Sequence, residues 1–265
     1  GEGRAGVLRA DLERTDGEAG LSGSTGRSGL LIRGEIIGGW ETRPHSRPYM
    51  AYVQIATWRG VKTCGGFLIR DDVVLTAAHC NDNYITVKLG VHNLRLWEWS
   101  RQEIRRIPHP QYDMYSFNND VMLLQLAHRA RLNEWVGLIP LPSTWQGVQP
   151  GAMCSVAGWG RTSARSAKGS DVLQEVDVEV LEDYVCLRNP DQIYRYYNTS
   201  TMLCAGDPKQ GKSSFKGDSG GPLVCGKTAQ GIVSWDSPNG TPPAVYTRVS
   251  RFVPWILETM RTLQP

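Results

Sequence analysis

The chain has 265 residues, with 29 basic and 26 acidic side chains, a formal net charge of +3 and 40% hydrophobic residues. This mildly basic, globular composition lacks the strong positive charge with which nucleic-acid-binding domains hold phosphates, so we expect no nucleic-acid partner. No apolar run approaches the ~20 residues of a membrane-spanning helix, and we expect no membrane span.

Residues 1–35 differ in composition from the rest. Gly, Ser, Thr, Arg, Glu and Asp dominate, and the only apolar cluster is Leu30-Leu31-Ile32. We expect a disordered leader or pro-segment over 1–35, followed by one domain over 36–265. The leader lacks the apolar stretch of about 7–15 residues of a secretory signal. A genuine pro-region and an altered start or alternative exon both stay open, and the composition favours the second.

Short strand-like segments separated by turn residues recur along the domain, which predicts an antiparallel all-β protein. An apolar run from Val74 leads to His79, and another run follows Asp120. Alternation of apolar and charged residues predicts a strand over 176–180, and a further strand is predicted over 86–91. The final apolar residues repeat at helical spacing, with Pro254 expected in the first turn: Phe252, Val253, Ile256, Leu257, Met260 and Leu263.

Glycines crowd Ser219 in the segment Phe215-Lys216-Gly217-Asp218-Ser219-Gly220-Gly221. A serine hydroxyl becomes a nucleophile only when a base takes its proton and an acid orients that base. His79 is the candidate base and Asp120 the candidate orienting acid. Each residue alone also fits an ordinary turn or cap, but the three together predict a catalytic triad.

The motifs Thr76-Ala77-Ala78-His79-Cys80, Asn119-Asp120-Val121 and Gly217-Asp218-Ser219-Gly220, in this order, resemble those of the trypsin/chymotrypsin family of serine endopeptidases. The order His, Asp, Ser distinguishes this family from other serine hydrolases. Further motifs that match begin at Ile36, Cys64, Ala157, Gly231 and Pro243. The resemblance implies two packed six-stranded antiparallel Greek-key barrels and a C-terminal helix, with no cofactor and no metal.

Six cysteines in such a chain indicate disulfides and an oxidising compartment, and spacing alone leaves 15 pairings open. The resemblance implies Cys64–Cys80, Cys154–Cys225 and Cys186–Cys204. The family's common disulfide beside the substrate pocket is missing, and Phe215 stands where one partner would be. This pattern resembles the granule serine proteases of immune cells, namely chymases, cathepsin G, granzymes and duodenase, which implies secretion or storage in granules.

The resemblance also assigns an activation mechanism. Cleavage after Glu35 would free the α-amino group of Ile36, which would pair with Asp218 and orient the N–H groups of Gly217 and Ser219 as an oxyanion hole. The chain as written is therefore predicted to be an inactive zymogen.

By alignment, Ser213 forms the base of the primary substrate pocket and Ala244 its wall, with Ser234, Trp235 and Asp236 along the cleft. An uncharged pocket predicts chymotrypsin-like cleavage after Phe, Tyr, Leu or Met. Asp236 stands where the family usually has Gly, and dual or basic-residue specificity stays open as an alternative, as does an Asp236 that only faces solvent.

Asn198 and Asn239 begin glycosylation sequons. We expect a monomer that cleaves protein or peptide substrates, and the resemblance adds serpin-type inhibitors and glycosaminoglycans as partners. A basic patch for the latter would use Arg101, Arg105, Arg106, Arg129 and Arg131, although scattered surface arginines explain these residues equally. The rival function is a catalytically silent cationic binding or antimicrobial relative.

Overall fold

The computed structural model describes residues 36–96, 101–143, 147–189 and 192–263, without the side chains of residues 101–103 and 192–193. The leader predicted for residues 1–35, including Glu35, lies outside this range, as does the side chain of Arg101.

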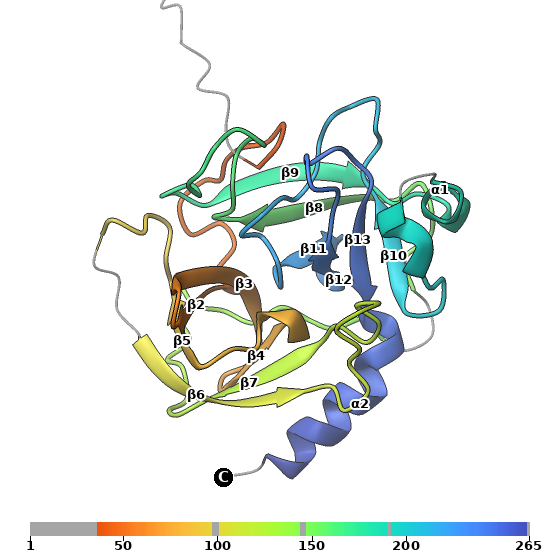
Figure 1. Cartoon of the computed structure of the whole chain (residues 1–265). Coiled ribbons are helices and arrows are strands. Elements are labelled where there is room, and N and C mark those ends of the chain that lie inside the picture. The colour runs from red at the N-terminus through yellow and green to blue at the C-terminus, as the bar shows by residue number, and fades with distance from the viewer. Residues whose placement is uncertain (1–35, 97–100, 144–146, 190–191, 264–265) are drawn as a thin grey trace, which may run out of the picture. The chain divides into compact units, whose positions relative to one another are not determined.

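The first sheet is a closed six-stranded antiparallel barrel with the strand order β2-β3-β4-β7-β6-β5 (Figure 1). Strands β2, β3 and β4 pair in chain order, as do β5, β6 and β7. The β4–β7 and β2–β5 pairings join these two sets and close the barrel. Its strands are β2 (Met50–Thr57), β3 (Gly60–Arg70), β4 (Val73–Thr76), β5 (Tyr84–Leu89), β6 (Arg101–Pro108) and β7 (Met122–Leu126).

The second sheet has seven strands in the order β1-β9-β8-β11-β12-β13-β10. Six of them curl until β10 reaches β9 through the bridge between Ala205 and Val180, and the two-residue β1 adds a seventh strand to the expected six. The strands are β1 (Trp40–Glu41), β8 (Met153–Gly158), β9 (Gln174–Glu179), β10 (Met202–Ala205), β11 (Pro222–Cys225), β12 (Thr228–Trp235) and β13 (Ala244–Arg248). The predicted pair of packed antiparallel sheets is confirmed.

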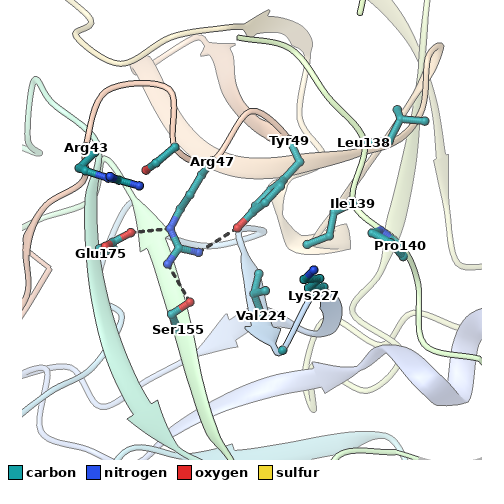
Figure 2. Close-up of a pocket in the computed structure, with 12 residues that line it drawn as sticks. Arg43, Arg47, Tyr49, Leu138, Ile139, Pro140, Ser155, Glu175, Val224 and Lys227 are labelled. Carbon is teal, nitrogen blue, oxygen red and sulfur yellow. Dashed lines mark hydrogen bonds and ion pairs between the residues drawn. The ribbon is translucent and has the colours of Figure 1, made fainter. Parts of the chain in front are cut away.

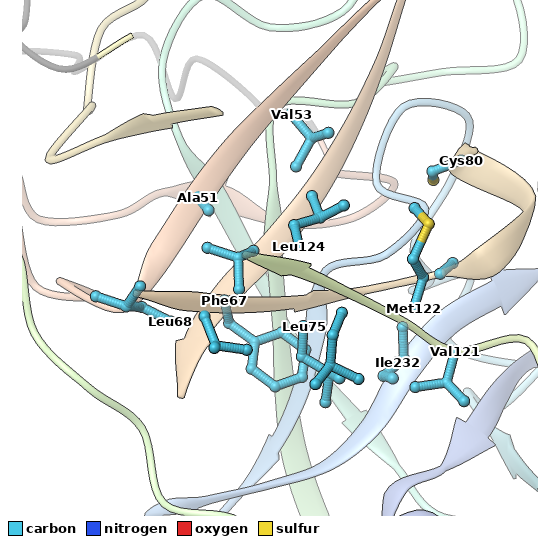
Figure 3. Close-up of a cluster of buried hydrophobic side chains, with 14 of the residues drawn as sticks. Ala51, Val53, Phe67, Leu68, Leu75, Cys80, Val121, Met122, Leu124 and Ile232 are labelled. Carbon is cyan, nitrogen blue, oxygen red and sulfur yellow. The ribbon is translucent and has the colours of Figure 1, made fainter. Parts of the chain in front are cut away.

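The core of the first barrel continues into the second sheet. Phe67, Leu75 and Met122 are fully buried inside the first barrel, and Ile232 of β12 packs with them (Figure 3). Burial of such apolar side chains contributes about 1.5–3 kcal/mol each, so this shared core holds the two sheets together. Residues contributed by the two sheets can therefore meet in a fixed geometry.

The helices are short except for the last: η1 (Ala78–Cys80), α1 (Asp183–Leu187), η2 (Gln192–Tyr196) and α2 (Val249–Thr262). The predicted C-terminal helix is confirmed as α2, but Pro254 lies in its second turn and not in the first, because the helix begins at Val249. Leu257, expected on the buried face, is 52% exposed because Ile256 takes the inward position. Among the described residues, no helix has the length and apolarity needed to cross a membrane.

The structure forms three disulfides, which join Cys64 to Cys80, Cys154 to Cys225 and Cys186 to Cys204. These are the pairs that the family resemblance implied. The first links β3 to η1 and so braces the segment that carries His79.

Candidate active site

His79 lies just beyond the end of a fully buried strand. The apolar residues of β4 fix the chain inside the first barrel, and η1 then turns it toward the second sheet. The Cys64–Cys80 disulfide ties the next residue to β3. The side chain of His79 is 16% exposed, so the imidazole remains partly accessible.

Asp120 is fully buried and holds His79 through two contacts. Its Oδ1 accepts the backbone N–H of His79 at 2.9 Å, and its Oδ2 lies 2.7 Å from the imidazole Nδ1. The Ser234 hydroxyl donates to Oδ2 at 2.6 Å, and the Thr247 hydroxyl donates to the Asp120 carbonyl at 2.8 Å. A buried carboxylate requires such hydrogen bonds, and they fix the ring with Nδ1 toward Asp120 and Nε2 away from it.

The loop that carries Ser219 packs directly against the strands next to His79. Gly65 of β3 donates its N–H to the Ser219 carbonyl at 2.7 Å. Gly220 has a φ of +86°, and a Cβ there would lie 2.1 Å from the Thr76 hydroxyl oxygen and 2.4 Å from the Gly65 carbonyl oxygen. Only glycine allows this approach. Ser219 of the second sheet is therefore held beside the end of β4, where the chain turns into His79.

Gly217 shapes the backbone on the other side of Ser219. Its φ is +102°, and a Cβ would lie 2.9 Å from the Gly160 Cα. The N–H of Asp218 donates to the Phe215 carbonyl at 2.9 Å, whereas the N–H groups of Gly217 and Ser219 have no acceptor in the described part of the chain. The N–H of Ser219 and that of Gly217, two residues before it, are thus available to a negatively charged oxygen.

Asp218 is fully buried behind this loop. Its two carboxylate oxygens accept the N–H groups of Gly160 and Phe215, each at 2.9 Å. Burial raises its pKa to about 7, and the nearby negative charge of Asp236 adds to the rise. No cation in the described residues pairs with Asp218. Ile36 is fully buried as well, and the Ile37 carbonyl accepts the Ser213 N–H at 3.2 Å.

A cleft of ≈ 440 Å³ contains Asp236 and Trp235, two of the five predicted pocket residues. Burial raises the pKa of Asp236 to about 7, while the positive charges of Lys216 and His79 act in the opposite direction. Asp236 therefore faces the cleft and lies close enough to His79 to interact electrostatically. The other lining residues are Tyr115, Ser116, Phe117, Arg195 and Tyr196.

The remaining predicted pocket residues are buried: Ser213, Ser234 and Ala244 are 1%, 4% and 0% exposed. The Ser213 hydroxyl has no hydrogen-bond partner within the described residues. Ser234, expected along the cleft, instead directs its hydroxyl to Asp120.

Sequence reasoning missed several residues around the triad. The Phe117 ring packs edge-on against the His79 imidazole at 5.5 Å, and Thr247 bonds the Asp120 backbone. Arg195 of η2 lines the cleft. Phe117 lies close to Asp120 in the sequence, whereas Arg195 and Thr247 are distant from it. No local pattern indicates that these three side chains reach the triad or the cleft.

The two sequon asparagines differ in exposure. Asn239 is exposed, and its side-chain oxygen accepts hydrogen bonds from Ser237 and Thr241. Asn198 is half-buried and accepts the Ser200 N–H at 2.9 Å. Within the described ranges, no cluster of three or more His, Cys, Asp or Glu side chains could hold a metal ion.

Known proteins resemble this chain over most of its length. The family described as Trypsin matches residues 36–256. Human cathepsin G is 51% identical over 234 residues, which cover 87% of this chain and 89% of that protein. Human granzyme B is 54% identical over 231 residues (86% and 92%), and the chymase of Papio hamadryas is 50% identical over 227 residues (84% and 90%).

A solved structure described as "Structure of GrC" matches with a TM-score of 0.79 and 45% identity. The match covers 85% of this chain and 100% of the chain in the solved structure. The chain belongs to the trypsin family of serine proteases.

Proposed function

We propose that this endopeptidase cleaves peptide bonds through the triad His79, Asp120 and Ser219. The His79 Nε2 takes the proton of the Ser219 hydroxyl while Oγ bonds to the substrate carbonyl carbon. The imidazolium then gives that proton to the leaving amine, and an acyl-enzyme remains. Water, deprotonated by the same imidazole, attacks the acyl carbon and releases Ser219.

Asp120 keeps the imidazole in the tautomer that this mechanism needs. The 2.7 Å contact from Nδ1 to Oδ2 supports this role most strongly. The Ser234 hydroxyl donates to the same oxygen and so helps to hold the carboxylate in this orientation. The negative charge can then stabilise the imidazolium during proton transfer.

The N–H groups of Gly217 and Ser219 would form the oxyanion hole. Their lack of internal acceptors in the described chain supports this role, because donors that bond elsewhere would have to break those bonds first. Removal of one such donor costs about 2.7–4 kcal/mol in related chemistry.

The specificity that we propose is cleavage after Phe, Tyr, Leu or Met. Ser213 and Ala244 are buried and carry no charge, which favours apolar side chains. Asp236 supports the alternative of dual or basic specificity, because its carboxyl group faces the cleft. Its pKa of about 7 means that the negative charge is only partly developed at neutral pH.

Activation would follow release of Ile36 from Glu35. The buried Asp218, which has no cation partner among the described residues, supports a requirement for the freed α-amine. As a granule-type protease, the protein would be stored in granules or secreted and would cleave protein substrates there.

A panel of peptide substrates tests this function. Protein that begins at Ile36 should cleave after Phe, Tyr, Leu or Met, and the Ser219→Ala variant should cleave none. Preferred cleavage after Lys or Arg would favour the Asp236 alternative. A folded wild-type protein that binds anionic surfaces but cleaves no peptide would favour the silent cationic relative.

A further inference from the structure

A second cleft, of ≈ 570 Å³, shares no lining residue with the cleft of Asp236. It lies between the segment that precedes β2, strands β8 and β9, residues 138–140 and the β11–β12 hairpin (Figure 2). Ligand pockets have volumes of about 300–1,000 Å³, so this cleft can hold a few side chains of a partner.

The floor of this cleft is a fixed hydrogen-bonded network around Arg47, which is 13% exposed. The guanidinium donates to Glu175 at 2.5 Å, to the Tyr49 hydroxyl at 2.8 Å and to the Ser155 hydroxyl at 2.8 Å (Figure 2). The other oxygen of Glu175 accepts the Trp40 indole N–H at 3.1 Å. Glu175 is the only carboxylate among the described lining residues, and both its oxygens are engaged.

Two further cations line the cleft, and neither has an ion-pair partner in the described chain. Arg43 lies in the exposed segment before β2, and Lys227 is exposed at the two-residue turn between β11 and β12. The preceding Gly226 has a φ of +64°, and the Cys154–Cys225 disulfide anchors β11 one residue earlier. A rigid cleft with two unpaired positive charges and no free negative charge favours an anionic ligand.

One wall of the same cleft is apolar. Leu138 is 45% exposed, and Ile139, Pro140 and Val224 continue the surface. The Pro140 carbonyl accepts the Ala229 N–H at 3.1 Å, which fixes the wall to β12. A sulfated sugar would match the cations but would leave this wall without an apolar partner.

We propose that this cleft binds an acidic peptide segment in which a carboxylate side chain lies next to a large apolar side chain. One carboxylate of the segment pairs with Lys227 and another pairs with Arg43, while the apolar side chain covers Leu138. The partner is thus a protein with an exposed acidic and apolar sequence, and its site is separate from the active-site cleft.

Isothermal titration calorimetry on the full chain with Ser219→Ala tests the proposal, because this variant would not cut the peptide. The probe is an acetylated hexapeptide of alternating Glu and Leu. We expect saturable binding with a Kd below about 1 mM. The double variant Arg43→Glu/Lys227→Glu should bind the peptide at least about tenfold more weakly. At each substituted position, attraction of a peptide carboxylate is replaced by repulsion.

The matched control is Arg165→Glu/Lys209→Glu, which makes the same charge change at exposed positions outside the cleft. It should bind the peptide like the parent, and Leu138→Ser should weaken binding without any change in charge. Equal loss in both charge-reversal variants would overturn the proposal. Three other results would also overturn it. They are equal affinity for a Glu–Ser hexapeptide, displacement of the Glu–Leu peptide by a heparin hexasaccharide to the same extent with and without Leu138→Ser, and no saturable binding of the Glu–Leu peptide.

Discussion

Release of the Ile36 α-amine should change how the stability of the protein depends on pH, because Asp218 is buried without a cation among the described residues. The comparison is between the full chain and protein that begins at Ile36. In the full chain, the nitrogen of Ile36 is part of a peptide bond and carries no charge. In the shorter protein, its ammonium group would pair with the Asp218 carboxylate.

The pKa of Asp218 rises from 3.8 to about 7 in the folded full chain. Between those values the unfolded chain has lost the proton and the folded chain retains it, so the free energy of unfolding falls as pH rises. The stabilisation that comes from holding this proton is complete below the pKa of Asp218 in the unfolded chain. It is lost as the pH rises through the pKa of Asp218 in the folded chain. Each pKa unit corresponds to ~1.36 kcal/mol, which gives a loss on the order of 4 kcal/mol.

Urea denaturation at a series of pH values measures this effect. The full chain should lose stability steadily between about pH 4 and pH 7, whereas protein that begins at Ile36 should lose much less, because the ammonium favours the ionised carboxylate. Asp236 titrates in the same range, so both proteins should also carry Asp236→Asn. The Asp218→Asn variant of the full chain should lose the slope. Identical pH dependence in the two proteins would refute the role of Asp218 as partner of the α-amine.

Three substitutions test other parts of the site. Gly220→Ala places a methyl group against the Thr76 hydroxyl at a positive φ, so the free energy of unfolding should fall by at least about 2 kcal/mol and activity should be lost; an unchanged denaturation midpoint would contradict the close approach. Ser234→Ala removes one hydrogen bond from Asp120, so kcat should fall about tenfold with little change in KM; an unchanged kcat would argue against this support of the triad. Asp236→Asn removes the carboxylate of the cleft, so kcat/KM for Lys and Arg substrates should fall relative to Phe substrates; an unchanged ratio would show that Asp236 does not contribute to specificity.

Short segments separated by turn residues predicted an antiparallel all-β chain, and the family resemblance implied its division into two sheets. Some strands, such as β4 and β10, are buried at every position, whereas alternation marks others. In β9, for example, Gln174, Val176 and Val178 are buried and Asp177 is exposed. The start of α2 was predicted less well. The apolar spacing began at Phe252, but the helix starts three residues earlier and includes Pro254 in its second turn. Packing of Val249 and Phe252 in the core outweighs the hydrogen bond that proline cannot donate.

Local motifs identified the residues of the candidate triad but not their surroundings. Ser234 was predicted by alignment with the family as part of the substrate cleft, yet its hydroxyl bonds Asp120, which is 114 positions away. Thr247 of β13 also reaches the triad through the meeting of the two sheets, whereas Phe117 contacts His79 within the first barrel. Such contacts depend on long-range packing, which no short sequence window contains.

The proposed triad is tested most directly by fluorophosphonate labelling of protein that begins at Ile36, followed by mass spectrometry of the labelled peptide. The reagent phosphonylates only a serine whose proton is taken by a base. We predict a single adduct on Ser219, which should be lost in the His79→Ala variant while the protein remains folded. An unlabelled Ser219 in folded protein, or labelling that persists without His79, would contradict the catalytic role of this triad.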